Sequence, residues 1–516
     1  MMIELLIAVC LLGSLTAALA PNEWAGKAAF LASLLPVAGS VWMYSTFEPV
    51  GNALTTDGDL AFETTAKWLT AGPYAINWHV GLDGISLPLI VLTTLLTALA
   101  IVSAWTPIDE RQSQFYALVL FLEAGLIGVF SALDFFVWFV FWEAVLIPMY
   151  LLIGVWGGPR RKYAAIKMFV YTNVASLVMF IGFVALVFGL DVSTFDLQTI
   201  TTALSNDAFV NDYLLLEVVS VDTLKLAAFA AMFFGFAVKV PVVPLHTWLP
   251  DAHVEAPTPV SVLLAGVLLK MGTYALLRFN FTMLPEVVTG NATVAFVIVL
   301  IAVVSVIYGA MLALAQSDLK RIVAYSSVSS MGYVILGLVA FTTFGIGGAT
   351  FQMVSHGLIS GLMFMTVGVI YNETHTRMVG DISGIVDKMP ITVGVFVAGA
   401  FGYMGLPLMS GFAAEFIVFQ GSFASDVSLL VGSMQLFTAL AMFGIVIVAG
   451  YLLWAMQRTL FGEYELATDY EVGRAPIQDV LSIGTLLLLV IALGVAPDVF
   501  FEMIRDATAP LVGGGA

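Results

Sequence analysis

Four ionisable residues lie in stretches of sequence that are otherwise apolar: Glu143, Lys239, Lys270 and Glu415. Placing such a group in the middle of a membrane-spanning helix costs about 2.5–3.5 kcal/mol on insertion scales, so each needs a partner or a function. Lysine and glutamate both exchange protons, and proton transfer is the chemistry that these residue types indicate. A structural role stays open for each residue, as an ion pair with another helix or, for Lys239, as a cation bound to free backbone carbonyls.

Lys239 and Glu415 stand near prolines that interrupt their apolar segments. Lys239 precedes Pro241 and Pro244, and Glu415 follows Pro407. Proline removes a backbone hydrogen bond and kinks or breaks a helix, so two broken helices are predicted. Paired breaks at corresponding positions mark the binding site of inverted-repeat transporters. We therefore expect the two residues at equivalent places in two halves of the fold.

Lys270 and Glu143 have no opposite charge close to them in the sequence. Lys270 lies roughly ten residues from either end of its apolar segment, about 15 Å at 1.5 Å per residue, which is too deep to reach the membrane surface easily. If Glu143 and Lys239 lie about 7 Å apart, they interact by roughly 2.4 kcal/mol at an effective dielectric of about 20. That energy is close to the roughly 2.3 kcal/mol of one charge crossing about 100 mV. Such a pair could gate proton release, with Lys270 and Glu415 as the next carriers.

Four further titratable residues are secondary candidates for the same path: His246, His253, His356 and Glu123. Histidine titrates near neutral pH and can shuttle protons. His246 and His253 flank the end of the first break, where a shuttle and a hydrogen-bonded loop residue both fit. His356 lies inside an apolar segment among small residues, which favours a functional role. Glu123 is a further carboxylate inside an apolar segment.

The composition places these residues in a membrane protein. Apolar residues make up 60% and charged residues 10% of the 516 residues, against about 25% charged residues in soluble domains. One cysteine and five scattered histidines, without a Cys-x-x-Cys pair, argue against a disulfide, an iron–sulfur cluster or another metal site. The net charge of −17 comes from acids that cluster in a few loops. It therefore indicates neither a basic partner nor nucleic acid.

Fourteen apolar segments of helical length run from end to end of the chain. Only helices satisfy their own backbone groups in lipid at this length, so an all-α polytopic bundle is predicted. The first segment ends in Ala18-Leu19-Ala20, which is similar to a signal-peptidase site, but Glu4 and the lack of Lys or Arg before it favour a retained helix. The segments centre near residues 11, 37, 94, 121, 145, 177, 233, 268, 302, 331, 359, 404, 446 and 487.

The distribution of Lys and Arg predicts the orientation of the bundle. With the N-terminus outside, 11 of the 18 Lys and Arg residues fall in cytoplasmic segments, as the positive-inside rule requires. The polar, acidic segments 48–66 and 191–222 are then outside, where we expect solvated loops. The basic residues expected at this outer face are Lys67, Lys225, Arg278 and Arg505.

A weak internal repeat predicts two inverted halves. Residues 174–180 in the sixth segment are similar to residues 358–364 in the eleventh, and an offset of five segments inverts the copies. Each copy precedes a segment broken by proline. The predicted division is 1–110 (helices 1–3 with an acidic loop), 111–285 (first repeat, helices 4–8), 286–465 (second repeat, helices 9–13) and 466–516 (helix 14).

The stretches around the candidate residues resemble the antiporter-like subunits of respiratory complex I, most closely the M type that corresponds to mitochondrial chain 4. A glutamate at position 415, where the L and N types carry lysine, points to the M type. The resemblance extends from about residue 80 to 460 and is carried by residues 139–150, 237–253, 265–270, 318–327 and 405–415.

This resemblance implies fourteen helices and a proton path through the four deep residues and His356, driven by quinone reduction elsewhere in the complex. The family often has histidine where this chain has Ser330, so water or the Ser330 hydroxyl would bridge that step. As a subunit of an H+-translocating NADH:ubiquinone reductase, the chain would carry no cofactor; FMN, iron–sulfur clusters and quinone would lie in partner subunits.

The expected partners are the L-type and N-type antiporter-like chains and lipids. The expected location is a bacterial inner (plasma) membrane rather than a mitochondrial one. Two alternatives stay open: an Mrp-type cation/proton antiporter subunit with the same fold, and a bundle that only scaffolds a redox complex. Four deep and separate charges argue against a scaffold.

Overall fold

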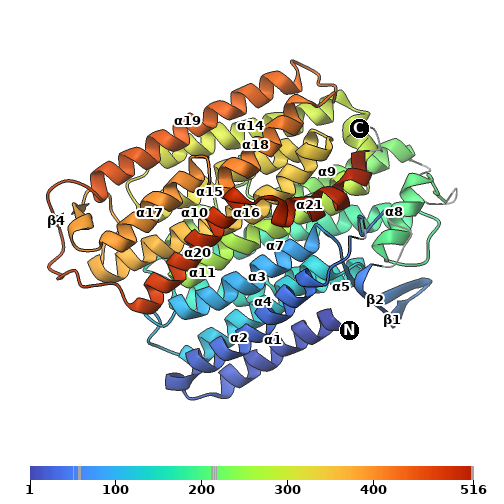
Figure 1. Ribbon diagram of the computed structural model, residues 1–516. Helices are drawn as coiled ribbons and strands as arrows, with labels where there is room; N and C mark the ends of the chain where they lie inside the picture. Colours follow the sequence, from blue (N-terminus) through green and yellow to red (C-terminus); the bar gives the residue numbers. More distant parts are fainter. Residues whose placement is uncertain (50, 56–59, 211–212, 214–215, 217, 513–516) are drawn as a thin grey trace.

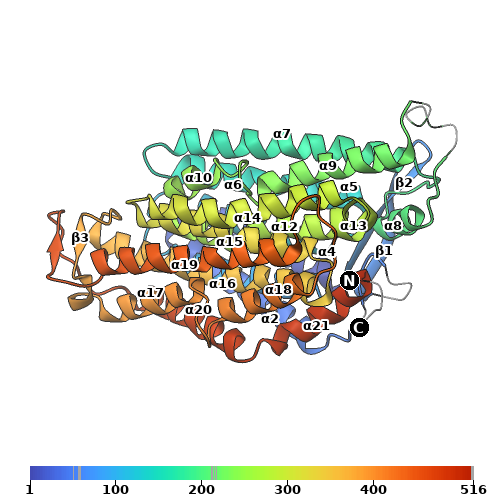
Figure 2. The same ribbon diagram turned by 90° about the horizontal axis from the view of Figure 1, so that it is seen from above.

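The computed structural model is a bundle of helices that run along one common direction (Figures 1 and 2). It describes residues 1–49, 51–55, 60–210, 213, 216 and 218–512. In this part of the chain, 13 helical spans are long and apolar enough to cross a membrane, and the shorter apolar helix Pro390–Tyr403 joins them. The predicted all-α polytopic fold is confirmed.

The helices before the middle of the chain are α1 (Met2–Leu19), α2 (Asn22–Ser45), α3 (Ser86–Ser103), α4 (Gln112–Ser131), α5 (Phe135–Ala144), α6 (Leu146–Trp156), α7 (Arg161–Phe188), α8 (Leu197–Ser205), α9 (Val221–Lys239) and α10 (Leu249–Glu255). The central helix, residues 258–282, consists of α11 (Thr258–Leu263), the π-helical η1 (Leu264–Leu268), α12 (Leu269–Ala275) and the π-helical η2 (Leu276–Thr282). After it come α13 (Pro285–Thr289), α14 (Ala292–Leu314), α15 (Leu319–Val339), α16 (Thr343–Thr374), α17 (Pro390–Tyr403), α18 (Ser410–Phe423), α19 (Met434–Thr459), α20 (Ile477–Val495) and α21 (Asp498–Thr508). Short 3-10 turns are η3 (Ile385–Asp387) and η4 (Ala509–Val512), and β3 (Ile382–Ser383) pairs with β4 (Glu465–Leu466).

Three helices form the core of the bundle. The apolar windows of the central helix and α16 are 100% buried, and that of α15 is 94% buried. On the peripheral helices α7 and α19, apolar side chains such as Ile181 and Phe443 are exposed. This arrangement places lipid-facing surface outside and leaves the core helices to carry the polar groups.

Both predicted breaks are present in the structure. The α9 helix ends at Lys239 and the chain resumes as α10 at Leu249. The α17 helix ends at Tyr403 and α18 begins at Ser410. The prolines after Lys239 and before Glu415 therefore interrupt two helices, as their chemistry requires.

A β-hairpin lies at the end of the bundle that holds the N-terminus and α21, which we call the hairpin end (Figure 2). It consists of the antiparallel strands β1 (Ala61–Ala71) and β2 (Tyr74–Leu82). The prediction of solvated loops at 48–66 and 191–222 is wrong where β1 and α8 form. Threonine and aromatic residues in 61–82 favour strands, and the Asp196 side chain caps α8 by accepting a hydrogen bond from the Thr199 N–H at 2.9 Å. Asp57, Asp59 and Asp212 of the predicted acidic loops lie outside the described residues.

His79 fixes the hairpin to the bundle. Its Nε2 lies 2.9 Å from Glu63 Oε1 on β1, and its Nδ1 contacts Asp196 Oδ2 at the start of α8. Burial alone would lower the pKa of His79, but the Asp196 and Glu63 carboxylates raise it above its ordinary value. The same contact holds the pKa of Asp196 below its ordinary value in spite of burial. The three residues therefore form an ion-paired clamp.

Candidate functional site

Lys239 is buried at the end of α9, and its side chain rests on an aromatic ring. It is 2% exposed, and its Nζ lies 3.8 Å from the centroid of the Trp142 ring. An aromatic face stabilises an ammonium group by about 0.5–2 kcal/mol without fixing it to one acceptor. Among the described residues, Nζ has no hydrogen-bond partner. The amine is thus free to lose its proton without breaking a hydrogen bond.

The purely structural reading of Lys239, as a cation bound to the free carbonyls of the break, is not supported by the geometry. The carbonyl of Val238 accepts a hydrogen bond from the Trp248 indole at 2.8 Å. The Val243 N–H donates to the Ser305 hydroxyl of α14 at 3.0 Å. Side chains other than Lys239 therefore satisfy backbone groups of the break.

Glu143 lies near the end of α5, close enough to Lys239 for an electrostatic interaction. Its Oε2 accepts a hydrogen bond of 3.4 Å from the Asn173 amide of α7. The carboxylate and the amine are thus neighbours without being locked together. The gate formed by these two residues stays a prediction.

Lys270 and His356, which are 86 residues apart in the sequence, are in direct contact. Lys270 Nζ lies 2.7 Å from His356 Nδ1 and also donates to the carbonyl of Ala265, in the π-helical η1. Lys270 is 0% and His356 1% exposed. When Lys270 is an ammonium, His356 Nδ1 accepts and its proton stays on Nε2. A proton leaving Lys270 therefore has an acceptor within hydrogen-bond distance.

Tyrosine hydroxyls lie beyond His356 in the direction of Glu415. The Tyr403 ring meets the His356 ring edge-on, with centroids 5.8 Å apart. The Tyr451 hydroxyl shares a hydrogen bond with the Ser326 hydroxyl of α15, and both Tyr403 and Glu415 are near enough to influence it electrostatically. Sequence reasoning missed these hydroxyls, because Tyr and Ser are ordinary residues in membrane helices.

Glu415 packs against the second break. It is 5% exposed, and its Oε2 has no hydrogen-bond partner within the described part of the chain. A Cβ atom added at Gly405 would lie 2.7 Å from this oxygen. The missing side chain at Gly405 therefore makes room for the carboxyl group. Ser330, which stands where the resembled family often has histidine, is buried on α15.

The secondary candidates are all buried, but in different surroundings. His253 stacks on Phe364 with 4.3 Å between ring centroids, and neither ring nitrogen has a partner among the described residues. His246 meets the Tyr308 ring edge-on. Glu123 is 0% exposed with both oxygens unpartnered among the described residues. Of these, His253 is near enough to both Lys320 and Lys270 for an electrostatic interaction.

A pocket of about 450 Å³ opens at the end of the bundle opposite the hairpin. Glu255 and Lys320 line it, together with the Asp318–Arg377 ion pair. Lys320 is 3% exposed and donates to the Ala256 carbonyl at 2.8 Å. Lys320 thus lies in the wall of this pocket and is near enough to His253 for an electrostatic interaction.

Comparisons with known proteins identify the family of the chain. A family described as NADH:quinone oxidoreductase/Mrp antiporter, TM, matches residues 132–447. The F(420)H(2) dehydrogenase subunit M of Methanosarcina mazei is 37% identical over 94% of this chain and 92% of its own length. An NAD(P)H-quinone oxidoreductase chain 4 of Synechococcus elongatus is 41% identical over 84% of this chain and 78% of its own.

Two solved structures share the whole fold. A chain of respiratory complex I from Thermus thermophilus matches with a TM-score of 0.83 and 26% identity, covering 100% of both chains. A chain of the Mrp complex from Dietzia matches with a TM-score of 0.83 and 22% identity, covering 99% of this chain and 97% of its own. At that identity, the Dietzia likeness bears on the fold alone.

Proposed function

Since the chain belongs to the NADH:quinone oxidoreductase/Mrp antiporter family of transmembrane proteins, we propose that it is the proton-translocating M-type subunit in the membrane arm of an NADH:quinone oxidoreductase of the complex I type. Of the relatives that match most of both chains, one is named as a subunit of an F(420)H(2) dehydrogenase and one as a chain of an NAD(P)H-quinone oxidoreductase. The Mrp-type alternative has less support, because the Mrp structure shares the fold at only 22% identity. The redox chemistry, with FMN, iron–sulfur clusters and quinone, lies on partner subunits in this proposal.

The observation that carries the proposal is the contact between Lys270 Nζ and His356 Nδ1 in the buried core. A cation and an imidazole in hydrogen-bond contact, away from water, form a pair that exchanges a proton rather than one that adds stability. Lys239, with Glu143 as its movable counter-charge, passes protons toward this pair. Glu415 receives them in the second half through hydroxyl groups and water.

The secondary residues complete the path. Protons enter from the pocket at Glu255 and Lys320 and reach Lys270 by way of His253. His246, beside the first break, and Glu123, in α4, serve as further carriers. The two broken helices support the division into repeats at 111–285 and 286–465, flanked by 1–110 and 466–516. Apolar side chains exposed on α7 and α19 suit lipid or neighbouring L-type and N-type chains in a bacterial inner membrane.

Replacing Lys270 with alanine in the assembled complex tests the proposal. Proton pumping, followed by the quenching of an acridine dye in inside-out vesicles that oxidise NADH with quinone, should be abolished. The matched control is Lys162→Ala, which removes an exposed lysine at the start of α7 and should leave pumping unchanged. Unchanged pumping in Lys270→Ala would rule out the relay. Purification of the chain with Mrp subunits, and without peripheral redox subunits, would assign it to the alternative.

A further inference from the structure

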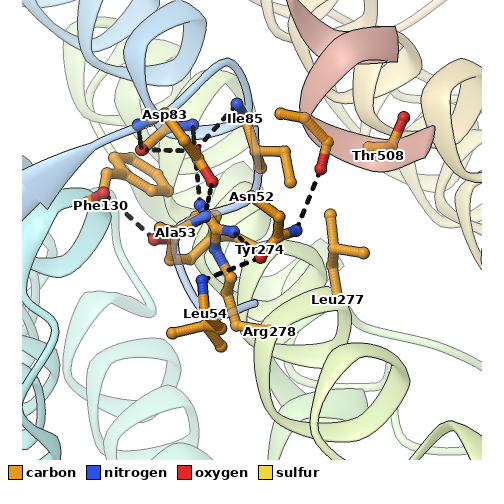
Figure 3. Close-up of polar contacts among 12 residues, drawn as sticks. Asn52, Ala53, Leu54, Asp83, Ile85, Phe130, Tyr274, Leu277, Arg278 and Thr508 are labelled. Atoms are coloured by element: carbon orange, nitrogen blue, oxygen red, sulfur yellow. Dashed lines mark hydrogen bonds and ion pairs between the residues drawn. The ribbon is translucent and has the colours of Figure 1, made fainter. Parts of the chain in front are cut away.

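Two buried cations of the bundle are held in different ways. The sequence placed Arg278 among the charges at the outer face, but the structure buries it in η2, where its Nη2 lies 2.6 Å from Asp83 Oδ1 (Figure 3). The Asn52 side-chain oxygen accepts from Arg278 Nη1 at 3.4 Å, and the Ala53 N–H donates to the Asp83 carboxylate at 2.8 Å. A paired charge and several hydrogen bonds therefore fix this cation in place, as is typical of a buried charge that serves structure.

Lys239 is held without fixed partners of this kind. Its Nζ has no hydrogen-bond partner among the described residues, and the nearby Glu143 acts on it through space. Nζ lies instead 3.8 Å from the centroid of the Trp142 ring. The face of an aromatic ring carries negative electrostatic potential, and the indole ring of tryptophan attracts an ammonium group most strongly. Trp142 is therefore the residue that stabilises the charged form of Lys239 when Glu143 is not close.

The Trp142 ring is held in place by contacts that do not involve Lys239. Its Nε1 donates to the Ser176 hydroxyl of α7 at 2.9 Å. Trp138 packs against it with 4.8 Å between ring centroids, and Phe236 of α9 with 5.6 Å. The ring is 1% exposed, so its contact with the ammonium group is shielded from bulk water, where such contacts are strongest. The ring therefore keeps its face toward the amine whether or not Lys239 carries a proton.

A neutral ring suits a proton carrier better than a carboxylate at hydrogen-bond distance does. A carboxylate in direct contact forms a strong charge-assisted hydrogen bond and would keep the ammonium group in place. The ring favours ammonium over amine by a factor of only about 2–30, which transfer to the next carrier can overcome. The indole also has no acceptor atom that could take the proton itself. Such a partner holds a proton without trapping it.

We propose that Trp142 is a positioning residue that keeps the proton on Lys239 while the Glu143 carboxylate is withdrawn. This inference rests on the proposed role of Lys239 as a proton carrier. Burial favours the neutral amine, so without the ring Lys239 would be unloaded as soon as its counter-charge moved away. The ring bridges that interval, and it gives a function to a residue that carries no proton.

The test weakens the face of the ring at nearly constant shape. Tryptophans with one, two and three fluorine atoms on the six-membered ring are incorporated at position 142 alone, by suppression of a stop codon, in the assembled complex. Each fluorine withdraws electrons from the ring face and weakens its attraction for a cation. The initial rate of proton pumping is then measured as a function of pH in inside-out vesicles that oxidise NADH with quinone.

With each added fluorine, the alkaline pH at which pumping falls to half should become lower, because the ring holds the ammonium group less tightly. The whole series should span at most about 1.5 pH units, which corresponds to the upper factor of about 30. The matched control is the same series at Trp138, a tryptophan of the same helix that is 0% exposed, and it should leave the pH profile unchanged. A profile that stays constant through the series at position 142, or that shifts equally in the series at position 138, overturns the proposal.

Two substitutions complete the test. Trp142→Phe keeps a ring with a weaker face and should move the same side of the pH profile to lower pH, whereas a wild-type profile in this variant overturns the proposal. Lys239→Ala should abolish pumping. Pumping that persists in Lys239→Ala overturns the role of Lys239 as a carrier and the role of Trp142 with it. If pumping is lost in Lys239→Ala but the fluorinated series is flat, the role of Trp142 alone is overturned.

Discussion

The contact between Lys270 and His356 makes His356 the most informative residue to replace. The 2.7 Å distance between Nζ and Nδ1 is that of a charge-assisted hydrogen bond, worth about 1.5–3 kcal/mol. At about 1.36 kcal/mol per factor of ten, losing this bond alone corresponds to a factor of about 10–160. Glutamine keeps an oxygen that can accept from Nζ but cannot carry a proton onward. Leucine removes both the acceptor and the carrier.

In vesicles that oxidise NADH with quinone, His356→Gln should lower the initial rate of proton pumping at least about tenfold, because a positioned acid–base group contributes about 10²–10⁴ to a proton-transfer step. His356→Leu should lower the pumping rate further than His356→Gln does, because leucine also removes the hydrogen-bond acceptor. The additional decrease should be at most about 160-fold, the upper value for loss of this hydrogen bond. The control is Lys162→Ala, an exposed residue at the start of α7 that does not line the proposed entry pocket. Pumping by His356→Gln within about twofold of the wild type would refute the assignment of His356 as a proton carrier.

Two further predictions concern the clamp on the hairpin and the second break. Because the folded-state pKa of His79 is raised, its ion pairs stabilise the hairpin fully below the unfolded pKa of about 6.5 and are lost as pH rises through the folded value. Amide hydrogen exchange in β1 and β2, corrected for intrinsic rates, should therefore speed up as pH rises above about 6.5, and a His79→Gln protein that shows the same pH dependence would contradict this. Gly405 has a φ of +62°, so replacing it with alanine should cost about 1–2 kcal/mol of stability and displace the Glu415 carboxyl group. The control is Gly394→Ala, whose added Cβ meets no atom within 4 Å. Gly405→Ala should show a lower Tm and less proton pumping than this control. Equal pumping by the two alanine variants would show that the position of the Glu415 carboxyl group does not matter.

The broken helices and the deep charges were predictable because their signals are local. A proline interrupts a helix wherever it stands in the interior, and a lysine among leucines and valines is conspicuous in lipid. Lys270, the breaks after Lys239 and before Glu415, and the all-α fold therefore follow from composition and spacing. The hairpin was missed because residues 61–66 were assigned to a polar loop and residues 67–82 were assigned to no element.

The partners of the charged residues were not predictable, because each depends on a contact between distant segments. Lys270 and His356 are 86 residues apart, and Ser326 and Tyr451 are 125 residues apart. No periodicity in a single sequence reports which helices pack together. Arg278 is a second example. Its place in the sequence assigned it to a membrane surface, whereas its contact with Asp83, 195 residues away, holds it in the interior.

Lys239 and Glu415 differ in the protonation state that is neutral, and this difference suggests a direction for proton transfer between them. Lys239 is neutral when it has given up its proton, and Glu415 is neutral when it has received one. Both residues are almost fully buried, at 2% and 5% exposed, and burial favours the neutral form of any ionisable group. Moving one proton from Lys239 to Glu415 therefore removes two buried charges at once. We therefore expect Glu143, beside Lys239, to reload the path as a counter-charge that approaches and withdraws, and we expect the control of the cycle to lie at the first break.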